Sequence, residues 1–171
     1  CRYCFRKNEL HTNDPLFKAN SDLLIQYLKE NPEVEEVILT GGDPLVLSDK
    51  KIDRLLSDIS SVASVQMIRF HTRTPVIIPE RLTSELLEIL TMHRKHFKAI
   101  SLVIHTNHAS EIDNQLIEAL GPYLSSKISL LSQSVLLKGV NDKVSDLKEL
   151  FQALYYGGIR PYYLHHPDPV K

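Results

Sequence analysis

Residues 99–108 read AISLVIHTNH, in which a run of mostly apolar and β-branched residues is followed at once by four polar ones. The same arrangement occurs five times along the chain. Runs typical of buried strands occupy Glu36–Thr40, Val65–His71, Ala99–His105, Ile128–Ser134 and Ile159–Leu164. They recur about every 30 residues with one helical pattern between neighbours, which predicts repeated β-α units and a parallel sheet.

Apolar residues at helical spacing fill the segments between these runs, and each segment begins near a residue that favours a helix N-cap. The candidate caps are Asn20 or Ser21, Ser48, Thr83, Ser110 and Ser145. Gly157-Gly158 is placed to end the last helix. No Gly-x-Gly-x-x-Gly follows any predicted strand, so the clearest sign of a dinucleotide-binding fold is missing from the sequence.

Polar or glycine-rich residues follow every predicted strand. The five clusters are Gly41-Gly42-Asp43-Pro44, His71-Thr72-Arg73, His105-Thr106-Asn107-His108, Gln133-Ser134 and His165-His166-Pro167-Asp168. The carboxyl ends of the strands are where barrel enzymes build their active sites. An open doubly wound sheet would spread these clusters along one edge, whereas a barrel would gather them. We therefore predict an α/β fold, a partial TIM-like (β/α) barrel with parallel strands.

Length and composition fit one domain, and we predict that residues 1–171 form it. The formal net charge of -1 gives no electrostatic reason to expect nucleic acid or a membrane surface as a partner, so a small-molecule substrate is favoured. No apolar run approaches the roughly 20 residues that span a bilayer, and a cytoplasmic location is predicted. The chain starts without Met and is interpreted as a fragment truncated at both ends.

Several polar residues have both a structural and a functional interpretation. Gly41-Gly42 is either a tight turn or a place where a ligand lies against bare backbone, with Asp43 offering a carboxylate to an amine or a ribose hydroxyl. Gln133, within an apolar run, needs a partner because an unpaired buried amide costs about 1–3 kcal/mol. Asp168, held between two prolines, forms an Asx turn or binds an ammonium group.

Histidine and arginine residues give weaker signals. His71 and Arg73 could cap strand ends or pair with a surface acid such as Glu80. His105 and His108 could hold a metal, but hydrogen bonding to a cofactor or to a neighbouring loop is favoured.

Two further segments are predicted to have no role in a site. His93 and His96 are predicted to lie at a solvated helix end, and Asn141-Asp142 in an ordinary loop.

The two thiols of the chain, Cys1 and Cys4, lie three residues apart. Thiols at this spacing can bind zinc, ligate an iron-sulfur cluster or form a disulfide, and two ligands are too few for either metal site on their own. A structural disulfide remains an alternative at this point.

With these motifs in view, the chain resembles the lysine 2,3-aminomutase family of radical S-adenosylmethionine (SAM) enzymes. The motifs that carry the resemblance, in order, are Cys1-Arg2-Tyr3-Cys4-Phe5-Arg6, Thr40-Gly41-Gly42-Asp43-Pro44-Leu45, Arg73-Thr74-Pro75, His105-Thr106-Asn107-His108, Gln133-Ser134-Val135-Leu136-Leu137, Gly139-Val140-Asn141-Asp142 and Arg160-Pro161-Tyr162-Tyr163. Tyr3, Phe5 and Pro44 look most similar to the branch that makes β-lysine for elongation factor P.

The resemblance implies three cofactors: a [4Fe-4S] cluster, SAM and pyridoxal 5'-phosphate. Cys1 and Cys4 match the second and third thiolate ligands of the cluster. Reductive cleavage of SAM would supply the radical that starts a 2,3-amino migration on L-lysine, with pyridoxal phosphate carrying the nitrogen. The lysine that tethers pyridoxal phosphate in the family would lie downstream of Lys171, so no catalytic residue is assigned.

The resemblance also assigns roles to strand-end residues. Gly41, Gly42 and Asp43 match the segment that receives the methionyl amine of SAM, and Gln133 matches a residue on the SAM side of the pocket. His105 and His165 match positions that line the cofactor pocket.

Two more residues match positions that bind the substrate. Arg6 matches the arginine that holds the substrate carboxylate, and Asp168 the aspartate that binds the distal amine of lysine. An electron-donor protein and a second copy of the chain are the expected protein partners.

Two rival functions remain open from the sequence. One is an aminomutase that acts on another amino acid such as glutamate, against which Asp168 argues because two carboxylates would meet. The other is a non-catalytic β/α domain whose Cys1 and Cys4 bind zinc or form a disulfide.

Overall fold

The computed structural model describes residues 21–166. They form a five-stranded, fully parallel sheet whose strands follow one another in the order β1-β2-β3-β4-β5. The strands are β1 (Glu36–Leu39), β2 (Met67–Thr72), β3 (Ala99–His105), β4 (Ser129–Val135) and β5 (Arg160–His165). A doubly wound sheet reverses its strand order at a switch point, and this sheet does not. The predicted partial β/α barrel is therefore confirmed.

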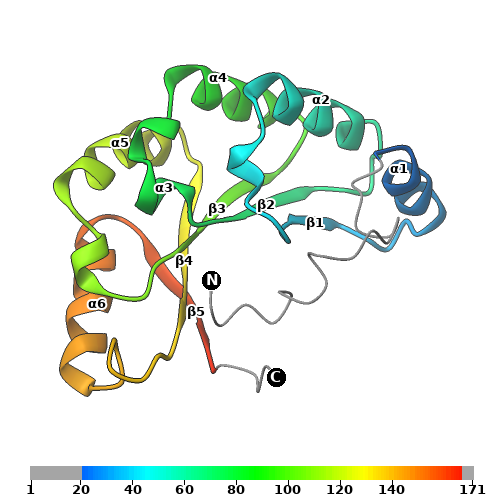
Figure 1. Cartoon of the computed structure of the whole chain (residues 1–171). Helices are drawn as coiled ribbons and strands as arrows, with labels where there is room; N and C mark the ends of the chain where they lie inside the picture. Colours follow the sequence, from blue (N-terminus) through cyan, green and yellow to red (C-terminus); the bar gives the residue numbers. More distant parts are fainter. Residues whose placement is uncertain (1–20, 167–171) are drawn as a thin grey trace.

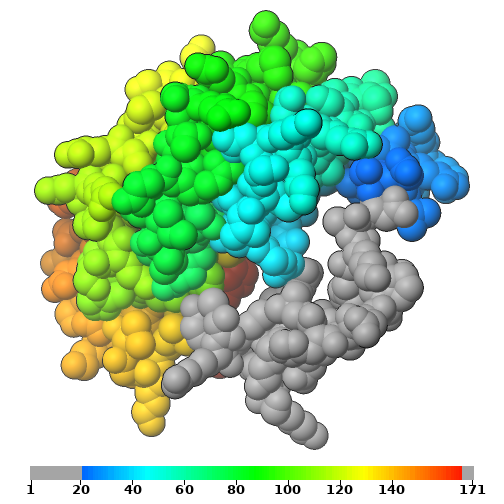
Figure 2. All heavy atoms as spheres, turned by 45° about the horizontal axis from the view of Figure 1, so that its top comes forward, coloured from blue at the N-terminus to red at the C-terminus, as the bar shows by residue number. Residues whose placement is uncertain are grey.

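Helices connect the strands and lie on the outer side of the curved sheet (Figure 1). The α-helices are α1 (Ser21–Glu30), α2 (Asp49–Ser60), α3 (Thr74–Ile77), α4 (Ser84–His93), α5 (Asn114–Ser125) and α6 (Val144–Tyr156). Short 3-10 turns follow three strands: η2 (Pro44–Val46), η3 (Pro79–Arg81) and η4 (Ala109–Glu111). In Figure 2 the segment around α2, in cyan, packs directly beside the green segment around α3 and α4.

The helix starts were predicted with mixed success. Ser48 and Thr83 occupy the N-cap positions of α2 and α4, and the Thr83 side chain accepts from the backbone N–H of Leu86. The predicted start after Ser110 is wrong, because α5 begins at Asn114 with Asp113 as its cap. Ser145 is likewise not a cap, since α6 begins one residue before it.

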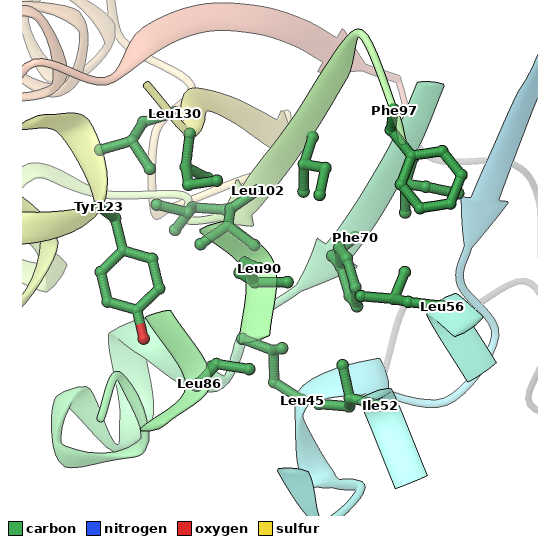
Figure 3. Close-up of a cluster of buried hydrophobic side chains, with 14 of the residues drawn as sticks. Leu45, Ile52, Leu56, Phe70, Leu86, Leu90, Phe97, Leu102, Tyr123 and Leu130 are labelled. Carbon is green, nitrogen blue, oxygen red and sulfur yellow. The ribbon is translucent and has the colours of Figure 1, made fainter. Parts of the chain in front are cut away.

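The hydrophobic core lies between the outer face of the sheet and the helices (Figure 3). Alternate strand residues supply one side of it, among them Phe70 and Leu102, which are fully buried. Leu56 and Leu90 from α2 and α4 are also fully buried against this face. The alternation of a parallel strand thus sends every second side chain into the core and leaves the others on the inner face of the curve.

His93 is part of this packing, contrary to prediction. It is 4% exposed, and its Nε2 lies 2.8 Å from Asp53 Oδ1 on α2. The predicted solvated helix end is therefore wrong at His93. No helix within residues 21–166 is long and apolar enough to cross a membrane.

Candidate functional site at the carboxyl ends of the strands

The inner face of the sheet is polar, unlike its outer face. Strand residues on this face include Glu36, Arg69, His71, Ser101, Val103, His105, Leu131, Gln133, Tyr163 and His165, and the apolar Ile38, Met67 and Ala99 lie on it as well. Val103 is fully buried yet lies outside the main core cluster, consistent with its position on the opposite face from Leu102 and Ile104. The inner face therefore holds a second, polar layer of contacts.

Arg69 connects three strands across the inside of the curve. Its guanidinium binds both carboxylate oxygens of Glu36 on β1 at 2.6 and 2.8 Å and donates to the Tyr163 hydroxyl on β5 at 2.7 Å. In a flat sheet β2 and β5 would be three strand spacings, about 14 Å, apart. A hydrogen bond between them shows that the sheet curls and that inner-face side chains meet in a common interior.

One layer closer to the carboxyl ends, a second contact crosses the same interior. His71 Nδ1 on β2 lies 2.9 Å from Gln133 Oε1 on β4, so Gln133 has the partner that the sequence required. The rings of Tyr163 and His165 stack with centroids 5.3 Å apart. His165 also lies close enough to lower the pKa values of His71 and His105.

The bend of β5 contributes to this gathering of rings. The register between β4 and β5 shifts after Ser132, which pairs with Pro161, so that Gln133 pairs with Tyr163 and Tyr162 is the extra residue of a bulge. Proline lacks a backbone N–H and is tolerated at sheet edges and bulges. The Arg69 guanidinium consequently lies 5.3 Å from the centre of the Tyr162 ring as well as 5.9 Å from that of Tyr163.

The turn after β1 is built by Gly41 and Asp43. Gly41 has a φ of 109°, a backbone conformation that side chains other than hydrogen rarely allow. Asp43 accepts hydrogen bonds from the Thr72 hydroxyl at 2.6 Å and from three backbone N–H groups, those of Leu45, Arg73 and Thr74. Its carboxylate thus fastens the glycine turn to the end of β2.

This arrangement refines the role expected for the turn. A carboxylate has about four lone-pair positions, and four donors of the protein already occupy those of Asp43. A Cβ placed on Gly42 would meet no atom of residues 21–166 within 4 Å, so within this part of the chain the backbone there borders open space. The glycine backbone is therefore the part of this turn that can receive a ligand.

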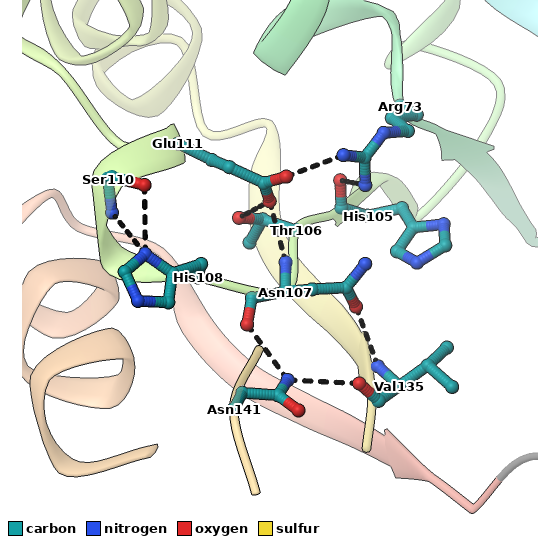
Figure 4. A network of polar contacts seen from close by, with 9 residues as sticks. All are labelled: Arg73, His105, Thr106, Asn107, His108, Ser110, Glu111, Val135 and Asn141. Atoms are coloured by element: carbon teal, nitrogen blue, oxygen red, sulfur yellow. Dashed lines mark hydrogen bonds and ion pairs between the residues drawn. The ribbon is translucent and has the colours of Figure 1, made fainter. Parts of the chain in front are cut away.

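A network of polar contacts braces the ends of β2, β3 and β4 (Figure 4). Arg73 pairs with Glu111 at 2.5 Å, and Glu111 also accepts from the Thr106 hydroxyl and the Asn107 N–H, both at 2.7 Å. Burial alone would raise the pKa of Glu111, but these hydrogen bonds and the charge of Arg73 hold it below its ordinary value. The predicted partner of Arg73, Glu80, instead accepts from Gln115.

Asn141 extends the brace to β4. Its amide nitrogen donates to the carbonyl oxygens of Asn107 and Val135, and its oxygen accepts from the Leu137 N–H. The residue is fully buried, so the prediction of an ordinary loop is wrong here. The asparagine in a loop rich in turn residues gave no sign of this, because its partners lie on two other segments.

His105, at the end of β3, is held neutral. Burial lowers the pKa of His105 to about 4, and the positive charge of Arg73 adds to the shift. A neutral imidazole can both donate and accept one hydrogen bond, which suits contact with polar groups of a ligand. His108 instead caps η4, with its Nδ1 accepting from the Ser110 N–H.

The structure brings together the strand-end residues that the sequence singled out. Gly41, Gly42, Asp43, His105, Gln133 and His165 all lie at the carboxyl ends of the strands. Cys1, Cys4, Arg6 and Asp168 lie outside the described residues. Among residues 21–166, no group of three or more His, Cys, Asp or Glu side chains could hold a metal ion.

Two grooves on the helical surface lie elsewhere. One is lined by residues of α1 and α2, including Gln26 and Asp58, and the other by residues of α2 and α4, including Lys50 and Glu88. Neither contains any residue predicted for the site. Fold and polar layer together define a partial β/α barrel with a candidate site at its strand ends.

Comparison with known proteins shows which family the chain resembles. The chain is 42% identical to the L-lysine 2,3-aminomutase of Buchnera aphidicola, 40% to that of Haemophilus influenzae and 37% to that of Escherichia coli, in each case over all 171 residues. It spans about half the length of these curated relatives, 49 to 50%. No protein-family model matches the chain. The resemblance to the lysine 2,3-aminomutase family is thereby confirmed along the whole chain.

Proposed function

We propose that this chain is the SAM-binding part of a radical SAM, pyridoxal-phosphate-dependent isomerase that converts L-lysine to β-lysine. The observation that supports it most is the similarity, from the first residue to the last, to proteins named L-lysine 2,3-aminomutase. The polar strand-end site provides the physical setting, since binding and orientation are the tasks that a protein performs for a reactive cofactor.

The described residues would hold SAM through polar contacts. The open backbone at Gly42 would receive its amine, and the Gln133 amide and neutral His105 would contact its carboxylate or ribose. His165 would cover the cofactor pocket from β5. SAM supplies the radical chemistry when it is bound beside a reduced cluster, and the surrounding polar layer keeps its position fixed.

Residues outside the described range complete the proposal. Cys1 and Cys4 would ligate the [4Fe-4S] cluster, Arg6 the lysine carboxylate and Asp168 its distal ammonium group. We place residues 1–171 in one domain, which the single core of residues 21–166 supports. We further propose a cytoplasmic enzyme that uses an electron-donor protein, assembles as a homo-oligomer and makes β-lysine for elongation factor P.

Anaerobic purification of the full-length protein tests this function. The expected preparation is brown, cleaves SAM on reduction, and forms β-lysine from L-lysine as detected by mass spectrometry. Cys4→Ala should remove the colour and both activities. A colourless wild-type protein that leaves SAM intact would favour the zinc or disulfide domain, and turnover of glutamate in place of lysine would favour the other aminomutase.

Asp168→Asn tests the substrate assignment separately. Loss of the carboxylate should weaken binding of L-lysine by about 10-fold or more, because a charge-assisted hydrogen bond is lost. An uncharged analogue such as norleucine should bind equally well to both proteins. Equal weakening for lysine and norleucine would contradict the assigned role.

A further inference from the structure

His71 lies on the polar inner face, although its sequence context suggested a strand-end cap or a pair with a surface acid such as Glu80. Its Nδ1 lies 2.9 Å from Gln133 Oε1, across the interior from β2 to β4. Strand β3 separates these two strands in the sheet, and its residue level with His71 is the small, buried Val103. The pair therefore passes over β3, which leaves room for it.

The partner of Nδ1 decides the state of the ring. An amide oxygen can only accept a hydrogen bond, so Nδ1 carries the proton and donates it to Gln133. Burial lowers the pKa of His71, and the nearby Arg69 charge lowers it further, while the hydrogen bond that His71 donates to Gln133 acts in the opposite direction. The ring is thus neutral at pH 7, with its lone pair on Nε2.

The same contact decides how the Gln133 amide points. With Oε1 turned toward His71, the NH2 group of the amide is directed away from it and its two donors are free of the His71 bond. Gln133 itself is level with His105 at the carboxyl end of β3. The NH2 group of Gln133 therefore lies at the level of the strand-end site.

The second ring nitrogen of His71 is not paired within the described residues. Nε2 of His71 is buried and has no hydrogen-bond partner among the described residues. Four of the five N–H donors of the Arg69 guanidinium serve Glu36 and Tyr163, and none of them binds His71 Nε2. A buried acceptor without a donor is unfavourable, so Nε2 requires a donor from outside the described residues.

We propose that His71 is a positioning residue that fixes the Gln133 amide, so that its NH2 group donates to an oxygen acceptor of the bound sulfonium nucleoside. This inference rests on the proposed function, because SAM is the ligand that it orients. His71 acts through Gln133 and need not touch the reacting atoms. Its effect is on affinity for the nucleoside.

A double-mutant cycle tests the coupling. The probe is S-adenosyl-L-homocysteine, which is not cleaved, titrated by calorimetry into the full-length, cluster-loaded protein without oxygen. Gln133→Ala and His71→Leu should each weaken binding about 5- to 10-fold, the worth of one hydrogen bond. Combined, they should cost no more than Gln133→Ala alone within about 2-fold. Equal, independent losses would overturn the inference.

His71→Asn is the matched control. The asparagine amide nitrogen can take the place of Nδ1 and still donate to Gln133, while nothing replaces Nε2. We expect it to bind the probe within about 2-fold of wild type. Binding as weak as that of His71→Leu would contradict a role through Gln133.

A measurement on the unmodified protein keeps the test independent of how the variants fold. The ¹⁵N spectrum of histidine in the full-length protein should show His71 neutral at pH 7 with its proton on Nδ1. A proton on Nε2 would overturn the inference. If the protein forms β-lysine normally but the double-mutant cycle shows no coupling between His71 and Gln133, only the inference about His71 is overturned. If the protein neither binds the probe nor forms β-lysine, the proposed function is overturned as well.

Discussion

The two faces of the sheet are built from alternate residues of the same strands, yet they differ in polarity. Phe70 enters a dry core between the sheet and helices, and its neighbours in sequence, Arg69 and His71, enter a polar interior. Burial of apolar area stabilises the outer face, and this effect does not depend on the orientation of the side chains. The inner face depends on hydrogen bonds with fixed directions. One strand can therefore contribute to stability through the side chains on one face and to a binding site through those on the other.

The largest effect expected from this contrast is on the outer face. Phe70→Ala should lower the free energy of unfolding by about 3–5 kcal/mol, because it removes a fully buried ring and leaves a cavity. Urea denaturation of the full-length protein, followed by circular dichroism, measures it. His71→Asn, one residue away, is the control and should cost less than about 1.5 kcal/mol. Equal losses would remove the distinction between the faces.

Asp43 lies where the two faces meet, and its removal should have the next largest effect. Asp43→Ala leaves the Thr72 hydroxyl and the Leu45 and Arg73 N–H groups without this acceptor, and the Thr74 N–H keeps only the Thr72 hydroxyl, for an expected loss of about 2–3 kcal/mol. Asp43→Asn retains one acceptor oxygen and should lose less. A stable Asp43→Ala protein with weakened SAM binding would show instead that the carboxylate serves the ligand directly.

Acid should act on the inner face through its histidines. The pKa of His105 is about 4 in the folded protein and about 6.5 in an unfolded chain, so the unfolded state binds more protons between these values. Stability from this residue is therefore complete above pH 6.5 and falls as the pH drops toward 4. His105→Gln should flatten that decline. Part of it should remain, because the pKa of His71 is lowered too.

The smallest predicted effect concerns the contact that joins β2 to β5. Tyr163→Phe removes the acceptor of the Arg69 hydrogen bond and should cost about 1 kcal/mol in urea denaturation. Tyr162→Phe keeps the ring that lies beside the same guanidinium and should change stability by less than about 0.5 kcal/mol. A larger loss of stability for Tyr162→Phe than for Tyr163→Phe would show that Tyr162, not Tyr163, makes the contact between the strands.

Sequence reasoning recovered the outer face better than the inner one. The strand Ala99–His105 was predicted with its observed bounds, because a continuous apolar run between polar segments is a local signal. The start of α5 was missed, since the segment after His108 forms η4 and places Glu111 against Arg73. That pairing depends on residues 38 positions apart, which no local pattern reveals.

The same reason explains which site residues were found. Gly41, Gly42 and Gln133 stood out by composition and by their place after a strand. Arg69 and Tyr163 did not, because their meaning arises only when residues 94 positions apart meet across a curled sheet. A polar residue within an apolar strand was the available signal, and it was used for Gln133 but not for Arg69.

A crystal structure of the full-length protein with S-adenosylhomocysteine bound, determined without oxygen, tests most directly whether the inner face is the binding face. The predicted result is a nucleoside at the carboxyl ends of the strands, against the backbone of Gly41-Gly42 and within hydrogen-bond distance of the Gln133 amide nitrogen. A nucleoside bound in the groove between α1 and α2, and not at the inner face of the sheet, would contradict the account.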